Sequence, residues 1–334
     1  MPICTFCTHS VSYLYTVYES EYNLRLEQCP NPKCLEFVDP YVEHDSLTIL
    51  LDLFLLKRGV YRHLLYNRGS KPRKLAERKT TVAESKGTLQ NEIADLNESN
   101  DEFSRWLFVL QLGCPLILVD SFIRWGYLNA SGPPITTPWT KHTLLAFLRV
   151  FMGTVAETVA FHGGITLTCY IIMKFLDVVQ SWARPTSAPK SSIRQHFHLS
   201  LISLSLFYSS LTKLFLLFLL TIWLPTPTTS FPRAENSLPE WANLFWRNES
   251  TNYILNAMEV FDDDKLDREW IVRNIVGGMS AGFGLRVILD IHPFFTTVVI
   301  LAGWTAKTVV ATLVSRWVGG DEMSTQAWLA YSIP

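Results

Sequence analysis

The sequence predicts a polytopic α-helical membrane protein of about four spans, with a small cysteine-rich N-terminal β domain and an interfacial helix. Of its 334 residues, 48% are hydrophobic and only 18% are charged, a charged share below the quarter typical of soluble chains. Four of the six cysteines lie within residues 1–34, and long apolar runs fill much of residues 105–320. A net charge of −1 gives no support to nucleic-acid binding, which needs a basic domain or stripe.

The first element is a cysteine cluster with the pattern C-x2-C, a gap of 21 residues, then C-x4-C, formed by Cys4, Cys7, Cys29 and Cys34. The chain opens without the basic and apolar regions of a signal peptide. We therefore expect this head in a reducing compartment, where clustered cysteines bind metal. Four thiolates suit one tetrahedral Zn²⁺ ion with no open position for water. Fe²⁺ would also fit, but zinc is the expected ion, in a structural role.

The gap between the two cysteine pairs predicts two strands. Residues 11–18 are rich in β-branched and aromatic side chains, which is typical of a strand. Residues 24–26 are expected to pair with that strand across a turn near residues 19–23. Together with the two cysteine knuckles, this arrangement predicts a zinc ribbon.

An apolar run over residues 47–56 follows, with Asp45 or Ser46 as a helix N-cap. About ten residues are too few to cross a bilayer, so we expect a buried or interfacial amphipathic helix. Apolar residues at 60, 61, 64 and 65 continue the helical spacing. That spacing leaves a polar edge formed by Arg62, His63 and Asn67.

Residues 3–67 resemble the homology domain of the Arv family, endoplasmic-reticulum membrane proteins of sterol and sphingolipid homeostasis. The family carries a cysteine ribbon, a Tyr-Val-Glu-x-Asp segment, an apolar helix and a Tyr-Arg-His-x-x-x-Asn ending. Here the segment is 41–45 and the ending is 61–67. The chain departs from the family in its second knuckle, because the family usually has C-x2-C there. The resemblance implies an important edge of Tyr61, Arg62, His63 and Asn67, which either docks the helix on the ribbon or touches lipid headgroups.

Three regions are expected along the chain. Residues 1–67 form the cytosolic zinc-ribbon and amphipathic-helix domain, residues 68–104 a charged linker, and residues 105–334 a transmembrane region with a long lumenal loop at about 225–269. Spans are predicted within 105–125, 143–173, 199–224 and 293–317, the second of them tilted or broken near Gly163-Gly164. Residues 270–291 carry charges among apolar residues, which favours an interfacial helix. The distribution of Lys and Arg predicts that the head and the C-terminus are both cytosolic.

Ionisable residues within spans are costly in lipid, so we expect them to face protein, water or the interface. Asp120 and Arg124 form an i,i+4 pair at the end of the first span. Glu157 and Lys213 lie deeper, on different spans, and can pair with each other. Gly278 and Gly282 are four residues apart, which predicts a flat face for close helix packing.

No protease, nucleophile-elbow or acyltransferase signature occurs, so we predict no catalytic residue and no enzyme. The resemblance implies a non-enzymatic mediator of sterol homeostasis, acting in sterol uptake, trafficking and distribution between membranes, with effects on sphingolipid metabolism. Its partners would be membrane lipids including sterols, in the endoplasmic-reticulum membrane or also in the Golgi membrane. The alternative is an accessory subunit of a membrane lipid or GPI-anchor biosynthesis enzyme, with those biosynthesis proteins as partners.

Overall fold

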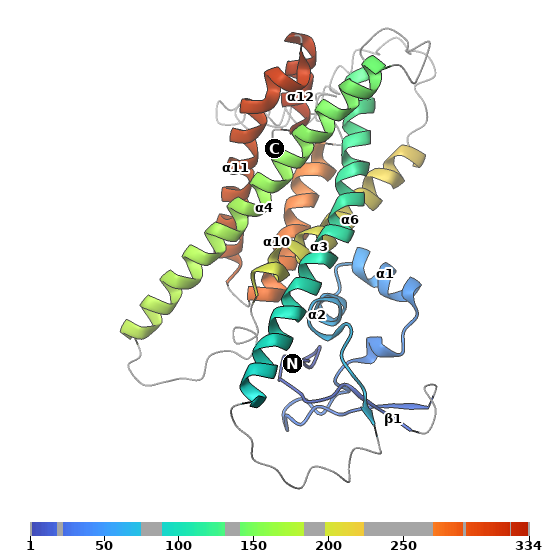
Figure 1. The fold of residues 1–334 in the computed structure, drawn as a ribbon, viewed down its shortest axis with the longest axis vertical. Helices are drawn as coiled ribbons and strands as arrows, with labels where there is room; N and C mark the ends of the chain where they lie inside the picture. Colours follow the sequence, from blue (N-terminus) through green and yellow to red (C-terminus); the bar gives the residue numbers. More distant parts are fainter. Residues whose placement is uncertain are drawn as a thin grey trace, which may run out of the picture.

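The protein is described from a computed structural model. The structure describes residues 2–18, 23–74, 89–130, 141–183, 198–223, 270–289, 292–320 and 322–332. The expected lumenal loop at about 225–269 lies outside the described residues, as does most of the turn expected near 19–23. Figure 1 shows a small head that contains the N-terminus, joined to a bundle of long helices.

The head contains a three-stranded sheet in the order β2-β1-β3. Strand β1 (Tyr15–Val17) pairs antiparallel with β2 (Leu24–Leu26), so that Thr16 lies opposite Arg25. The predicted strand is therefore confirmed, but it is shorter than residues 11–18. Strand β3 (Arg73–Lys74) lies parallel to β1 on its other side. Because β3 belongs to the expected linker, the sheet of the head extends beyond residue 67.

Short helices connect the sheet to the bundle. A turn of 3-10 helix, η1 (Pro40–Val42), precedes helix α1 (Ser46–Phe54). The Asp45 carboxylate caps α1 by accepting from the Thr48 N–H at 3.2 Å, as the sequence predicted. Helix α2 (Arg58–Arg62) continues directly into a π-helical segment, η2 (His63–Asn67).

The long helices are α3 (Leu89–Ala130), α4 (Lys141–Ala183), α6 (Leu199–Trp223) and α11 (Pro293–Gly319). Each contains a stretch long and apolar enough to cross a membrane, namely 102–128, 143–179, 199–220 and 293–319. The predicted fold class and its four spans are confirmed. Of the two alternatives for the second span, the break does not occur, because helix α4 continues through Gly163-Gly164. Helix α3 differs from the expectation, since it already begins at Leu89, within the expected linker.

The segment predicted to be interfacial lies inside the bundle instead. It consists of a π-helical turn, η4 (Ile271–Val276), followed directly by α10 (Gly277–Leu289). Buried residues recur through α10, and its C-terminal half shares a core with the N-terminal half of α6 and the start of α11. Helix α10 therefore runs antiparallel to α6. Hydropathy missed this helix as a bundle member because Arg273, Asn274 and Arg286 interrupt its apolar pattern.

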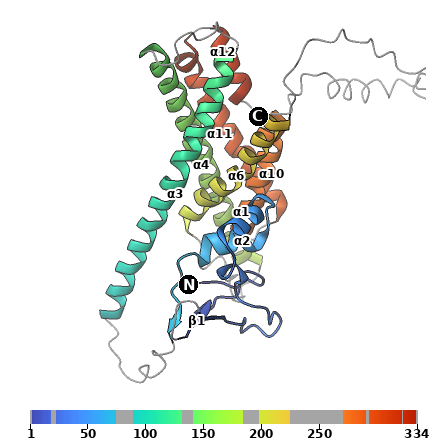
Figure 2. The same cartoon turned by 90° about the vertical axis from the view of Figure 1, so that its right-hand side faces the viewer.

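The direction of α10 determines the end of the bundle at which the C-terminal helix lies. Helix α11 starts at the end of the bundle nearest the head, and α12 (Glu322–Ser332) packs at the other end, where Trp328 and Val318 lie in one core with Val150. Figures 1 and 2 both show α12 at the top of the bundle and the head at the bottom. The prediction that head and C-terminus share one side thus differs from the structure, which places them at opposite ends of the bundle.

One hydrophobic core joins the head helices to the bundle. It contains buried residues of α1, α2 and η2 together with residues of α3, α6 and α10: Leu53, Val60, Tyr61, Leu65, Val109, Leu201, Leu204, Phe207, Tyr208, Val287 and Ile288. The Tyr61 ring packs edge-on against Phe283 at 5.6 Å between centroids, and Phe54 stacks on Phe215 at 4.3 Å. The short helices are therefore part of the bundle, and the ribbon is attached through them.

Candidate metal centre and intramembrane cavity

The four predicted ligands converge in the structure. The Sγ atoms of Cys4, Cys7, Cys29 and Cys34 all lie within 4.8 Å of one another. The Cys4–Cys34 separation is 3.9 Å and the Cys7–Cys29 separation is 3.4 Å. A tetrahedral ion with metal–sulfur bonds of roughly 2.3 Å separates its sulfurs by about 3.8 Å. This donor set therefore fits one metal ion, and four thiolates are the ligands typical of a structural zinc site.

The two knuckles end in the same way despite their different lengths. In each, the residue after the second cysteine has a left-handed backbone, with φ +66° at Thr8 and φ +54° at Leu35. The first turn is closed by the Thr8 N–H donating to the Cys4 carbonyl oxygen at 2.9 Å. The second is closed by the Cys34 N–H donating to the Asn31 carbonyl oxygen, also at 2.9 Å. The two extra residues of the C-x4-C knuckle are thus accommodated without separating its thiols from the cluster.

The thiols differ in acidity. Burial raises the pKa of the Cys29 thiol to about 12 and also raises the pKa of Cys4. Burial acts in the same direction on Cys7, but the backbone N–H of His9 and the neighbouring thiols outweigh it and lower the pKa of Cys7 below its ordinary value. A bound ion must displace the remaining thiol protons, which makes binding release protons.

Arg62 joins the first knuckle to α2. Its Nη1 donates to the carbonyl oxygens of Thr5 at 2.7 Å and Phe6 at 2.8 Å, the two residues between Cys4 and Cys7. The side chain is buried, with 8% of the residue exposed. Of the two roles left open by the sequence, the contacts of Arg62 are those of a residue that docks the helix on the ribbon. The lipid-headgroup role does not fit a guanidinium enclosed in this way.

Asp39 forms a second set of contacts between the head and η2, and the sequence analysis assigned no role to this residue. Its fully buried carboxylate lies 2.7 Å from His63 Nδ1 and accepts from Asn67 Nδ2 at 2.7 Å. The other carboxylate oxygen accepts from the Tyr41 N–H at 3.1 Å. An aspartate directly before Pro40 has the sequence pattern of an ordinary helix cap. Its contacts with His63 and Asn67 could therefore not be recognised from the sequence.

Helix α1 presents an apolar surface that no described residue covers. The residues Leu47, Leu50, Leu51 and Leu55 are each at least 40% exposed, and we call this set the α1 leucine face. The opposite side of the helix is fixed to the protein through Leu53 in the core, and Phe54, at the C-terminal end of the leucine side, stacks on Phe215. Because Phe215 lies within the span 199–220, the α1 leucine face lies beside a membrane-spanning helix.

The intramembrane charges form a network centred on Arg124. Its Nη1 lies 2.6 Å from Glu157 Oε2, and its Nε lies 3.0 Å from Asp120 Oδ2. Lys213 Nζ lies 3.9 Å from Asp120 Oδ1. The expected Glu157–Lys213 pair is therefore absent from the described residues. Glu157 pairs with Arg124 of α3 instead, and Lys213 pairs with Asp120. The i,i+4 pair of Asp120 and Arg124 is present as expected.

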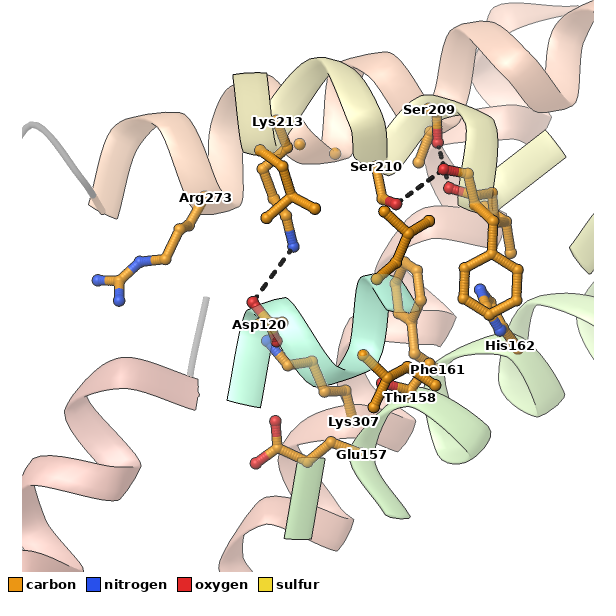
Figure 3. Close-up of a pocket in the computed structure, with 18 of the residues that line it drawn as sticks. Asp120, Glu157, Thr158, Phe161, His162, Ser209, Ser210, Lys213, Arg273 and Lys307 are labelled. Atoms are coloured by element: carbon orange, nitrogen blue, oxygen red, sulfur yellow. Dashed lines mark hydrogen bonds and ion pairs between the residues drawn. The ribbon is translucent and has the colours of Figure 1, made fainter. Parts of the chain in front are cut away.

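These charges line a cavity of about 140 Å³ between α3, α4, α6, η4, α10 and α11. Figure 3 shows Lys213 directed towards Asp120, with Glu157 and Lys307 on the neighbouring helices. Arg273 and Lys307 also line this cavity, and sequence reasoning missed both as intramembrane charges. A lysine near the middle of the apolar run 293–319 was the available signal for Lys307.

Glycines allow the helices around the cavity to approach closely. A Cβ on Gly278 would lie 2.6 Å from Cζ2 of Trp304, while a Cβ on Gly282 would have only ordinary contacts, the nearest at 3.7 Å. The predicted close packing therefore occurs at Gly278.

Comparison with known proteins gives one family. The model of the Arv1-like family matches residues 3–250. The chain is 48% identical over 65 residues to a protein named Protein ARV1 from Saccharomyces cerevisiae, which is 20% of this chain and 19% of that protein. It is 48% identical over 64 residues to Protein ARV 2 from Arabidopsis thaliana, covering 19% of this chain and 27% of that protein.

A third relative, Protein arv1 homolog from Dictyostelium discoideum, is 41% identical over 68 residues, which is 20% of this chain and 27% of that protein. The matched stretch thus spans only about a fifth to a quarter of the length of these relatives. No solved structure matches the chain significantly.

Proposed function

The chain belongs to the Arv1-like family, and from this membership we propose that it mediates sterol homeostasis. It would act in sterol uptake, trafficking and distribution between membranes, with effects on sphingolipid metabolism, from the endoplasmic-reticulum membrane. The family is known for sterol and sphingolipid homeostasis, and its match covers the head and most of the spans. The four candidate spans of the chain are those of a multi-pass membrane protein.

The observation that carries the proposal is the α1 leucine face. An exposed apolar surface beside a span is stable in contact with acyl chains or a sterol and unfavourable in water. The Phe54–Phe215 stack keeps this surface at the depth of α6. A short helix held at that depth, without crossing the membrane, provides a surface against which a lipid can pack and from which it can leave.

The metal centre supports this arrangement from the ribbon. We propose that the ion is Zn²⁺, because four thiolates are a zinc donor set and the head is expected in a reducing compartment. Bound there, the ion supplies a structural cross-link between the two knuckles. The first knuckle holds Arg62 at the end of α2, and α2 in turn lies in the same core as Leu53 of α1.

We also propose that the protein catalyses no covalent step. A metal with four cysteine ligands has no open coordination position at which water or substrate could be activated. In the cavity, both carboxylates are ion-paired to Arg124, which leaves neither as an obvious general base.

The experiment is complementation of a deletion strain, read out as sterol distribution between the plasma membrane and internal membranes. The wild-type chain should restore the distribution. The double variant Leu47→Gln/Leu51→Gln, which makes one side of the α1 leucine face polar, should restore it poorly at equal protein abundance. Leu35→Gln is the matched control, because Leu35 is 68% exposed but lies on the second knuckle.

Two outcomes oppose the proposal. Failure of the wild-type chain to restore sterol distribution would contradict the assigned function. Full restoration by the double variant would contradict the role of the α1 leucine face. Stoichiometric co-purification of the wild-type chain with a lipid or GPI-anchor biosynthesis complex, with normal sterol distribution in the deletion strain, would favour the accessory-subunit alternative.

A further inference from the structure

The cavity among the spans carries more positive than negative charge. Among its described lining residues there are two carboxylates, Asp120 and Glu157, and four cations: Arg124, Lys213, Arg273 and Lys307. Arg124 already contacts both carboxylates, at 3.0 and 2.6 Å. Lys213 reaches Asp120 only at 3.9 Å, the outer limit of an ion pair. Two positive charges therefore remain without a matching carboxylate in the described part of the cavity wall.

The cations in excess are Arg273 and Lys307. Arg273 packs over the ring of Tyr331 at 3.7 Å, but its Nε and Nη1 atoms are buried and have no hydrogen-bond partner. Lys307 lies within electrostatic reach of Asp120 and Glu157, but among the described residues it forms no ion pair of the kind that Arg124 and Lys213 form. The amide nitrogen of Asn274, also in the lining, is buried and lacks an acceptor. The buried polar atoms without a partner on this wall of the cavity are thus mostly hydrogen-bond donors.

The cavity lies at the depth of the spans. Lys307 is near the middle of the span 293–319, and Asp120 and Lys213 lie within the spans 102–128 and 199–220. Uncompensated charge at this depth is unfavourable, and charged residues in such positions typically mark a ligand or ion pathway. A bound anion that accepts hydrogen bonds would balance the excess positive charge and give the unpartnered donors an acceptor.

We propose that this cavity binds a phosphate-bearing anion. The buried Nε–H and Nη1–H groups of Arg273 have no hydrogen-bond partner, and as charged donors they suit phosphate oxygens. Lys307 and Lys213 act as point charges, and Asn274 donates one further hydrogen bond. A volume of about 140 Å³ is below the roughly 300–1,000 Å³ of pockets that enclose drug-sized ligands, so the cavity suits a compact headgroup rather than a sterol ring system.

Other features of the wall define the ligand further. Glu157 Oε1 is a buried acceptor without a partner, and it matches a protonated oxygen of a phosphate monoester. Apolar residues complete the lining, including Leu116, Leu206 and Trp304, and they favour an ester whose attached group is a hydrocarbon. The same phosphate chemistry could come from a lipid headgroup or from free phosphate, and the two sources are separated by experiment.

The test uses the full-length, metal-loaded chain purified in detergent and stripped of co-purified lipid. Three probes are titrated: short-chain phosphatidic acid, diacylglycerol with the same chains, and inorganic phosphate. Native mass spectrometry gives stoichiometry and affinity, and the melting temperature gives an independent readout. We expect one phosphatidic acid to bind and diacylglycerol to bind weakly, since the two lipids differ only in the phosphate. Binding of inorganic phosphate with comparable affinity would assign the site to free phosphate.

Two variants test the residues. Arg273→Gln and Lys307→Gln should each weaken binding of the phosphate probe at least about tenfold, as expected for loss of a charge-assisted hydrogen bond. The matched controls are Arg286→Gln on α10 and Arg316→Gln on α11, because both arginines are exposed. Lys307→Arg, which keeps the charge, should retain binding.

A stability measurement separates loss of binding from misfolding. Without ligand, Lys307→Gln should melt no lower than the wild type, because it removes an unmatched positive charge. With phosphatidic acid, only the wild type and the controls should gain stability. The proposal is overturned if neither phosphate probe binds the wild type, or if both cavity variants bind as tightly as the wild type. These outcomes do not depend on sterol distribution, so this proposal can fail separately from the proposed function.

Discussion

Asn67 forms a closed pair of hydrogen bonds with Ile3, from which it is separated by 64 positions. Its Oδ1 accepts from the Ile3 N–H at 2.9 Å, and its Nδ2 donates to the Ile3 carbonyl oxygen at 2.9 Å. The amide of Asn67 thus pairs with the backbone as a neighbouring strand would. Because Ile3 directly precedes Cys4, the end of η2 fixes the position at which the first knuckle begins.

Replacing Asn67 by Asp removes both donor contacts of Nδ2 and places a second carboxylate against the buried Asp39. A lost buried hydrogen bond with an unsatisfied partner costs about 1–3 kcal/mol, and more when charge is involved. We expect a lower melting temperature and faster metal loss to a chelator. Asn31→Asp is the control, since Asn31 uses only its acceptor oxygen. An unchanged rate of metal loss in Asn67→Asp would mean that this pair does not support the knuckle.

Arg62→Ala should weaken metal retention, although Arg62 is not a ligand. Its loss leaves the carbonyl oxygens of Thr5 and Phe6 without their charged donor, at a cost of about 1.5–3 kcal/mol for a hydrogen bond to a charged group. If Arg62 only touched lipid headgroups, the metal content of this variant would be unchanged. Metal analysis during a chelator titration distinguishes the two expectations. Arg25→Ala on β2 is the control, because Arg25 is exposed.

Cys29→Ser should reduce bound metal and destabilise the ribbon, because a site with three thiolates has an open coordination position. Cys169→Ser is the matched control: Cys169 is also buried, but in α4 and outside the cluster. Metal content is measured on the full-length chain, since the head shares its core with the bundle. Equal metal content in the two serine variants would rule out the cysteine cluster as the binding site.

Adjacent glycines in α4 should respond oppositely to alanine. A Cβ on Gly164 would lie 2.8 Å from the Cβ of Ala306 on α11, whereas a Cβ on Gly163 meets nothing within 4 Å. Gly164→Ala should destabilise the bundle by about 1–3 kcal/mol through overpacking. Gly163→Ala should be neutral or stabilising by up to about 1 kcal/mol, because alanine is the better helix former. Thermal unfolding in detergent checks both, and equal shifts would contradict the packing of α4 on α11.

The two ends of the chain should be accessible from opposite faces of the membrane. The head lies at one end of the bundle and α12 at the other. In sealed microsomes, protease should remove a tag on the N-terminal head and spare a tag after residue 334. Cleavage of both tags without detergent would show that the two ends of the chain lie on the same face of the membrane, which would contradict the antiparallel placement of α10. A detergent-treated sample shows that the protected tag can be cleaved.

The head was largely predictable because its signals are local. Two cysteine pairs, a β-rich run and an N-cap are each recognisable within a few residues, and the structure bears out the strand pairing and the cap at Asp45. Contacts over long separations were not predictable. The contacts of Asp39 with η2, the pairing of Ile3 with Asn67 and the addition of β3 each depend on residues that only the folded chain brings together.

The four candidate spans of the bundle were predictable from the sequence, but the interior of the bundle was not. Apolar length identifies a span without saying which face meets which neighbour. The sequence therefore allowed Glu157 and Lys213 to pair, whereas the packing of α3 on α4 brings Arg124 to Glu157. Helix α10 was missed as a bundle member because charged and polar residues such as Arg273 and Arg286 interrupt the apolar pattern of its segment.

The shared core also sets an order in which the protein can be completed during synthesis. Asn67 and β3, which the ribbon needs, both precede the first candidate span at residue 102. Metal can therefore enter the ribbon while the rest of the chain is still on the ribosome. Tyr61 can pack against Phe283 only after the chain between them has been synthesised. At roughly 5–20 residues per second, this synthesis takes about 10–45 s. During that interval the apolar side of α2 is uncovered, and its timely burial depends on the insertion of α6 and α10.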